Sequence, residues 1–122
     1  MLLKDFYGVG TSVKNGPDCC TEITINKEHH LYAGHFPRRP VTPGVILMQL
    51  FKEEAERLSM HKLQLDKASN IKFTAVVDPH EENNLKINST IDVNADTVVL
   101  KGTAEHKNAI ALKINAVYKI IK

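Results

Sequence analysis

The run from Val45 to Phe51 constrains the fold more than any other segment, because Gln49 is its only polar residue. At 3.6 residues per turn, apolar side chains on such a run point in every direction around a helix, so it predicts a helix buried on most sides. Thr42 can cap this helix, and Pro43 suits the first helical position, where a missing N–H costs nothing. Residues 52–58 are charged and amphipathic, so the helix is predicted to enter a core and then leave it.

The rest of the chain alternates apolar and polar residues with a period of two, which is typical of half-buried strands. With the helix inserted, the order is β-β-α-β-β-β-β, which predicts an α+β fold with about six antiparallel strands. A helix apolar on nearly every side needs the sheet to curl around it, or a second copy of the chain to cover it. The predicted strands are 21–26, 71–77, 85–93, 98–100 and 110–118, with 2–14 as a weaker candidate and a turn at 15–18.

Length and charge exclude several classes of protein. The chain has 122 residues, which predicts one domain over 1–122. A net charge of +2 gives no broad basic field for nucleic acid. The longest uncharged stretch, residues 40–51, is too short to span a membrane.

Cys19 and Cys20 are adjacent and are predicted to be free thiols. Free thiols fit a reducing compartment, so we expect a cytoplasmic protein.

The segment from Gly34 to Val45 carries the chemistry. His35 lies in a stretch stiffened by three prolines, and Gly44 follows nine residues later at the predicted helix start. This places a base near free backbone N–H groups at the positive end of a helix dipole. Such a pair can remove a proton next to a carbonyl while the N–H groups stabilise the oxyanion.

This segment resembles the active-site signature of the FabZ/FabA-type β-hydroxyacyl-acyl-carrier-protein dehydratases, and residues 70–79 are similar to the strand that follows the helix in that family. The resemblance implies a hot-dog fold, in which an antiparallel sheet wraps one long central helix, and dehydration of a 3-hydroxyacyl thioester to a trans-2-enoyl thioester without a cofactor. By the same resemblance, His35 takes the C2 proton, and the N–H groups of Gly44 and Val45 hold the thioester carbonyl. The other substrate-binding positions that it implies are Gly34, Phe36 and Pro43.

The match breaks at the position of the family's acid, which is a Glu or Asp contributed by the other subunit of a dimer. Here this position is Gln49, and an amide cannot deliver a proton. Losing a general acid lowers the rate by ~10²–10⁴. Glu53 lies one turn further along the same helical face, and its spacing from Arg57 also predicts a surface ion pair.

Three hypotheses follow. In the first, Glu53 replaces the missing acid. In the second, a different hot-dog subunit supplies a carboxylate that faces His35. In the third, the chain binds acyl thioesters without dehydrating them, and it either hydrolyses them as a thioesterase or serves as a non-catalytic accessory subunit. The first requires at least a homodimer and the second a hetero-oligomer.

Among the remaining arginines and histidines, two arginines are candidates for docking a partner, and the histidines have no predicted function. Arg38 and Arg39 lie beside the predicted pocket mouth, where they are candidates for docking an acidic acyl carrier protein, with coenzyme A as the other possible carrier. His29 and His30 have no further ligands at metal spacing, so no metal site is predicted. The histidines predicted to be exposed to solvent are His61, His80 and His106.

Overall fold

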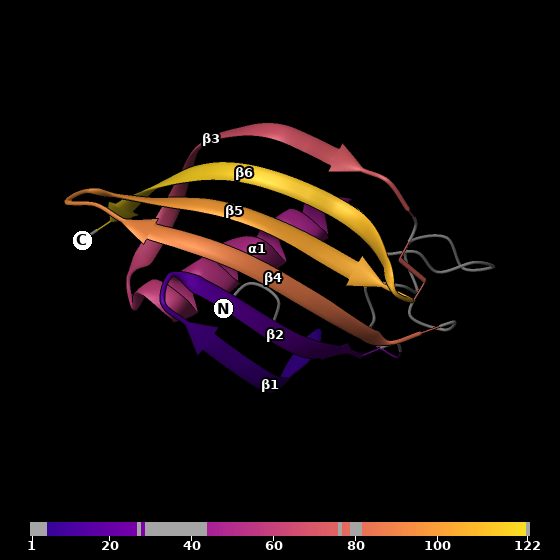
Figure 1. The fold of residues 1–122 in the computed structure, drawn as a ribbon. Helices are drawn as coiled ribbons and strands as arrows, with labels where there is room; N and C mark the ends of the chain where they lie inside the picture. Colours follow the sequence, from indigo (N-terminus) through magenta and orange to yellow (C-terminus); the bar gives the residue numbers. More distant parts are fainter. Residues whose placement is uncertain (1–4, 27, 29–43, 76, 79–81, 122) are drawn as a thin grey trace.

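The structure is a computed structural model that describes residues 5–26, 28, 44–75, 77–78 and 82–121. These residues form one helix and a six-stranded sheet, in which every strand pair is antiparallel (Figure 1). The sheet order is β1-β2-β4-β5-β6-β3. The α+β prediction is therefore confirmed, including its element order. The strands are β1 (Tyr7–Asn15), β2 (Asp18–Ile25), β3 (Lys62–Phe73), β4 (Asn84–Val93), β5 (Thr97–His106) and β6 (Ala109–Ile121), and the helix is α1 (Gly44–Ser59).

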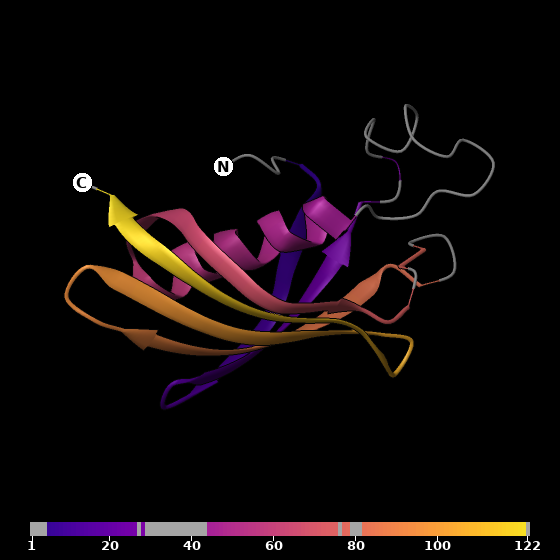
Figure 2. The same cartoon turned by 90° about the horizontal axis from the view of Figure 1, so that it is seen from above.

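Helix α1 lies across one face of the sheet, which bends around it (Figure 2). It connects β2, next to one edge of the sheet, to β3 at the opposite edge, so the chain crosses the whole face between them. Leu50 and Phe51 are fully buried against the sheet. Gly102 in β5 permits this close packing, because a Cβ atom there would lie 2.5 Å from the Phe51 ring. Within the part of the chain that the structure describes, no helix is long and apolar enough to cross a membrane.

Irregular pairing bends the two edge strands. The register of β1 with β2 shifts between Val9 and Ser12, and that of β3 with β6 shifts twice. Such shifts locally increase twist and let a strand curve. The turn predicted between β1 and β2 is confirmed, and Gly16 adopts a φ of 63° there, which glycine accepts without strain.

Three predicted elements differ from the structure. The strand predicted at 98–100 is the longer β5, Thr97–His106. The strand predicted at 71–77 is instead β3, Lys62–Phe73. As an edge strand it buries only Leu63, so it lacks the alternation by which buried strands are detected. The second half of α1 was predicted to leave the core, but Glu53 and Glu54 are 5% and 2% exposed. The sheet wraps the helix far enough to cover both carboxylates.

The prediction that His106 is exposed is wrong. This side chain at the end of β5 is 4% exposed, and its Nε2 lies 2.8 Å from the carbonyl oxygen of Glu82. The interaction satisfies a ring nitrogen that burial has removed from water, which makes His106 a structural residue. His61 is exposed as predicted, and His80 lies outside the described residues.

Candidate active site

The start of α1 is where the sequence placed it, and an aromatic ring covers it. The helix begins at Gly44, and a Cβ atom on this residue would lie 2.7 Å from the ring of Phe73 at the end of β3. Phe73 is 52% exposed, so the ring covers the helix start from the solvent side. Because Gly44 has no side chain, the Phe73 ring can pack closely against the backbone at this position. Val45 follows in the first turn of the same helix.

Gln49 and Glu53 lie on one face of α1, as their spacing predicts. Gln49 Nε2 donates a hydrogen bond to Glu53 Oε2 across 3.2 Å. An ionised carboxylate only accepts hydrogen bonds, so the Gln49 amide must turn its NH₂ group toward Glu53. Its carbonyl oxygen, Oε1, is then the atom of the amide that can accept a hydrogen bond from a ligand.

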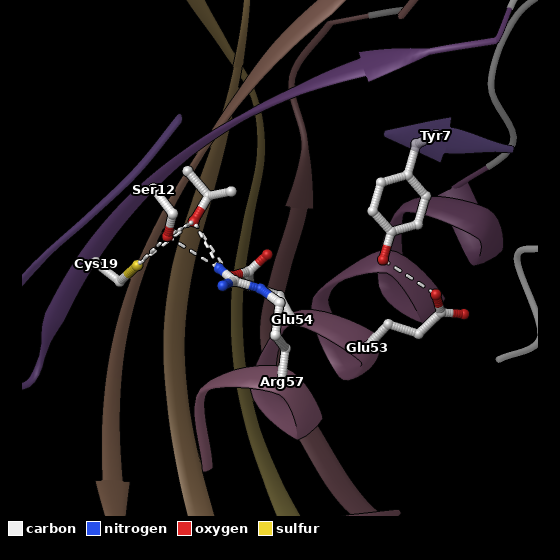
Figure 3. Close-up of polar contacts among 7 residues, drawn as sticks. Tyr7, Ser12, Cys19, Glu53, Glu54 and Arg57 are labelled. Carbon is white, nitrogen blue, oxygen red and sulfur yellow. Dashed lines mark hydrogen bonds and ion pairs between the residues drawn. The ribbon is translucent and has the colours of Figure 1, made fainter. Parts of the chain in front are cut away.

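Tyr7, which the sequence did not single out, completes this arrangement. Its hydroxyl, on β1, donates a hydrogen bond to Glu53 Oε1 across 3.1 Å (Figure 3). Burial, and after it the negative charge of Glu53, raises the pKa of the Tyr7 phenol above its usual value. Tyr7 therefore keeps its proton and shares it with Glu53. The residue lies within the weakest predicted strand, 2–14, and nothing in its spacing relates it to the helix.

Both oxygens of Glu53 thus accept a hydrogen bond, one from Tyr7 and one from Gln49. We call these three residues the Glu53 cluster. In this arrangement Glu53 acts as the acceptor of two hydrogen bonds and orients the side chains that donate them.

A second carboxylate, one residue further along α1, holds a separate network. Glu54 Oε1 accepts a hydrogen bond from Thr21 Oγ1 across 3.2 Å and forms an ion pair with Arg57. Arg57 also donates to Ser12 and Thr21 (Figure 3). The predicted surface pair of Glu53 with Arg57 is therefore wrong: Arg57 pairs with Glu54, and this network ties α1 to β1 and β2.

A small pocket borders Gln49 on the other side of the helix. It has a volume of about 200 Å³ and lies between α1 and strands β3 and β6. Its walls are mostly apolar, and Gln49 and Lys52 line it beside Met48, Leu65, Ile114 and Tyr118. The amide thus contacts a buried carboxyl group and also borders a mostly apolar space.

The remaining predicted site residues cannot be placed beside this cluster, because they lie outside the described residues: Gly34, His35, Phe36, Arg38, Arg39 and Pro43. Their roles stay predictions. Among the described residues, no three His, Cys, Asp or Glu side chains gather as metal ligands.

Comparison with known proteins places this site in context. The profile of the ApeI dehydratase family, described as ApeI-like, matches residues 11–112. A 3-hydroxyacyl-[acyl-carrier-protein] dehydratase FabZ from Bartonella henselae is 38% identical over 56 residues, which cover 46% of this chain and 34% of that protein. A FabZ from Lactobacillus helveticus is 32% identical over 87 residues, covering 66% of this chain and 56% of that protein. The chain thus matches only part of the length of these curated relatives.

Solved structures show the same fold. A chain of the dehydratase heterocomplex ApeI:P from Xenorhabdus doucetiae has a TM-score of 0.73 at 15% identity, over 92% of this chain and 96% of that one. A thioesterase from Haemophilus influenzae has a TM-score of 0.69 at 12% identity, over 99% and 82%. These likenesses confirm the hot-dog fold predicted from the sequence.

Proposed function

Because this chain belongs to the ApeI-like dehydratase family, we propose that it dehydrates a 3-hydroxyacyl thioester to the trans-2-enoyl thioester, and that a second hot-dog subunit supplies the acid. The observation that carries the second part is the Glu53 cluster. Gln49 occupies the acid position, and the nearest carboxylate already accepts hydrogen bonds on both oxygens.

The reaction needs two proton transfers. A base removes the proton from C2, the electrons of that bond form the C2–C3 double bond, and the C3–O bond breaks. An acid protonates the departing oxygen, so that water leaves. We assign the base to His35 and the polarisation of the thioester carbonyl to the N–H groups of Gly44 and Val45, on the strength of the resemblance.

Neither Gln49 nor Glu53 suits the acid role. An amide has no acidic proton to give. Glu53 is 5% exposed, and its two oxygens accept hydrogen bonds from Tyr7 and Gln49. Gln49 Oε1 can instead accept a hydrogen bond, either from the 3-hydroxyl of the substrate or from a protonated carboxyl group. The chain therefore orients the leaving group, and the proton comes from elsewhere.

A partner subunit is the simplest source of that proton. The dehydratase from Xenorhabdus doucetiae with the same fold is described as a heterocomplex. We propose that this chain likewise assembles with a different hot-dog subunit, whose Asp or Glu faces His35. A homodimer would bring only a second Gln49 to the same place.

The test compares the chain alone with the chain mixed with a candidate hot-dog subunit, and follows the absorbance of the enoyl thioester. We expect little activity alone, activity with the partner, and a gain of activity in the isolated Gln49→Glu variant. Glu53→Gln is compared with Glu56→Gln, a matched control on the same helix whose carboxylate accepts from the Leu63 amide instead. Full activity of the chain alone, lost in Glu53→Gln but not in Glu56→Gln, would assign the acid to Glu53 and overturn the partner.

A thioesterase is the second candidate, and Gln49 favours it. An amide with a fixed orientation beside an apolar pocket can hold a water molecule near a thioester carbonyl. The same incubations distinguish the two reactions, because hydrolysis releases a free thiol and a free acid, whereas dehydration leaves the thioester intact. Thiol release without enoyl absorbance, lost in Gln49→Ala, would replace the dehydratase proposal.

We assign the recognition of an acidic carrier protein to Arg38 and Arg39. Their reversal to Glu is expected to raise the Michaelis constant for a carrier-linked substrate far more than for a short-thiol analogue. Equal effects on both substrates would contradict this role.

A further inference from the structure

The face of the sheet turned away from α1 carries a depression of about 730 Å³, lined by residues from all six strands. Figure 1 shows the sheet from this side, with α1 behind it. Side chains alternate between the faces of a strand. A Cβ atom on Gly102 would point at Phe51 in α1, so the neighbouring side chains of Lys101 and Thr103 point away from the helix. We call this depression the outer trough; Lys72, Lys101 and Lys113 line it.

The three lysines come together through strand register. Lys72 in β3 pairs directly with Lys113 in β6, and Lys101 in β5 pairs with Asn115, two residues along β6 from Lys113. All three lysines are exposed. Like charges directly opposite each other on a sheet destabilise it. The pair of Lys72 with Lys113 is therefore an unfavourable arrangement for the empty protein.

Within the described residues, no ion pair joins Lys72, Lys101 or Lys113 to a carboxylate, and the pairs of Arg57 with Glu54 and of Lys119 with Asp66 do not reach the trough. Asp18 lines the trough, but Thr90 separates it from Lys101 in the register, which is two strand spacings or about 10 Å. Thr90 Oγ1 also donates a hydrogen bond to Asp18 across 2.7 Å. Glu105 on the same face accepts a hydrogen bond from Asn88, so the lysine end of the trough keeps a positive charge that no ion pair in the described part of the chain neutralises.

A neighbouring row on the same face shows how this sheet otherwise arranges charge. Glu22 in β2 pairs with Lys86 in β4, and Lys86 pairs with Glu105 in β5, so the signs alternate. The lysines of the outer trough break this pattern. The amide of Asn115 beside them adds a donor that suits an oxygen-rich ligand, whereas the Asn88 amide donates to Glu105 and Thr103.

We propose that the outer trough binds a small organic phosphate or pyrophosphate, with Lys72, Lys101 and Lys113 holding the anionic group and the organic part lying along the sheet. The volume falls within the range of roughly 300–1,000 Å³ that small-molecule sites occupy. Phosphate also relieves the repulsion between Lys72 and Lys113. The trough lies on the opposite side of the sheet from the Glu53 cluster, so this site is independent of the proposed dehydration.

Thermal unfolding with and without sodium pyrophosphate tests the proposal, with sodium chloride at matched ionic strength as the reference. The wild type should gain several degrees in Tm from pyrophosphate, because a ligand that binds only the folded state stabilises it. Lys113→Gln should melt above the wild type without ligand, since the repulsion is gone, and should lose most of the gain from pyrophosphate.

Lys86→Gln is the matched control, because this lysine lies on the same face between two glutamates and outside the trough. It should keep the full gain and should not melt above the wild type. The same gain in wild type and Lys113→Gln, or no gain beyond sodium chloride, would overturn the proposal.

Calorimetric titration with ADP then tests the organic part of the ligand. The wild type should bind ADP more tightly than it binds pyrophosphate. The double variant Lys101→Gln with Lys113→Gln should bind ADP at least tenfold more weakly than the wild type does. Circular dichroism of the double variant checks that it is folded. Equal affinity for ADP and pyrophosphate would overturn the assignment of an organic phosphate, and equal affinity of the two proteins for ADP would overturn the site.

Discussion

The hydroxyl of Tyr7 lies 3.1 Å from Glu53 Oε1 and so ties the first strand of the sheet to the middle of α1. The bond joins residues 46 positions apart and reaches a carboxylate that is 5% exposed. It therefore has two effects. It helps to fix the helix in the sheet, and it holds the group that sets the orientation of the Gln49 amide.

Removing this hydroxyl should weaken the fold by a measurable amount. Tyr7→Phe keeps the ring but takes one donor from a buried carboxylate, and hydrogen bonds to charged groups contribute about 1.5–3 kcal/mol. We expect a loss of about 1–2 kcal/mol in the free energy of unfolding by urea, since Tyr7 is only half-buried. In a Glu53→Gln background the same change should cost less, which a double-mutant cycle measures. Equal costs in the two backgrounds would show that Tyr7 does not act through Glu53.

Tyr118 should make the fold sensitive to alkali. Burial, and after it the charge of Glu56, raises the pKa of Tyr118 from 10.0 to about 12. Below pH 10 the phenol is neutral in both states and its contribution is complete. Between pH 10 and about 12 the unfolded chain loses this proton and the folded chain keeps it, so stability falls. At ~1.4 kcal/mol per pKa unit, the fall is about 3 kcal/mol.

Urea unfolding of the wild type and Tyr118→Phe across this pH range checks the prediction. The variant should show the shallower decline, because one titrating group has been removed. Parallel pH dependence in the two proteins would contradict the shift.

Gly102 should tolerate no side chain. Its Cβ position lies 2.5 Å from the Phe51 ring, so Gly102→Ala must displace either the ring or the strand. Overpacking of this kind typically costs ~1–3 kcal/mol. Gly8→Ala is the matched control, because nothing lies within 4 Å of its Cβ position. Urea midpoints should therefore drop for Gly102→Ala and stay close to the wild type for Gly8→Ala.

Arg57 should matter through the carboxylate that it neutralises. Glu54 is 2% exposed, so Arg57→Met leaves a buried carboxylate that has lost its ion pair and keeps the hydrogen bond from Thr21. Breaking a fully buried pair costs ~3–5 kcal/mol, and the Arg57 side chain is 40% exposed, so we expect about 2–3 kcal/mol. Adding Glu54→Leu should restore part of this loss, because the stranded charge is then gone. A double variant weaker than Arg57→Met would contradict that explanation.

The helix was predictable because its local sequence alone indicates both how deeply it is buried and where it starts. Apolar residues from Val45 to Phe51 predicted burial on most sides, and Pro43 with Gly44 predicted where it starts; the structure begins α1 at Gly44 and buries Leu50 and Phe51 completely. The position of Gln49 one turn before Glu53 likewise followed from the helical repeat, and their hydrogen bond agrees with it.

What could not be predicted depends on contacts between distant parts of the chain. The role of Tyr7 requires knowing that β1 passes beside the middle of α1, and the burial of Glu54 requires knowing how far the sheet wraps. Most of strand β3, before residue 71, escaped detection because an edge strand buries little and so carries no alternation. His106 was misjudged for a similar reason, since its partner at Glu82 is supplied by another segment.

The route of the chain through the sheet has a consequence for the speed of folding. Strands β4, β5 and β6 follow one another with short turns and can pair locally. The β1–β2 hairpin must instead pair with β4, joining Asp18 to Thr90 across 72 positions of sequence. Sheets dominated by such distant pairings fold in milliseconds to seconds, because a long loop must close before the contacts form. The joining of the hairpin to β4, over a helix already in place, is therefore expected to set the refolding rate.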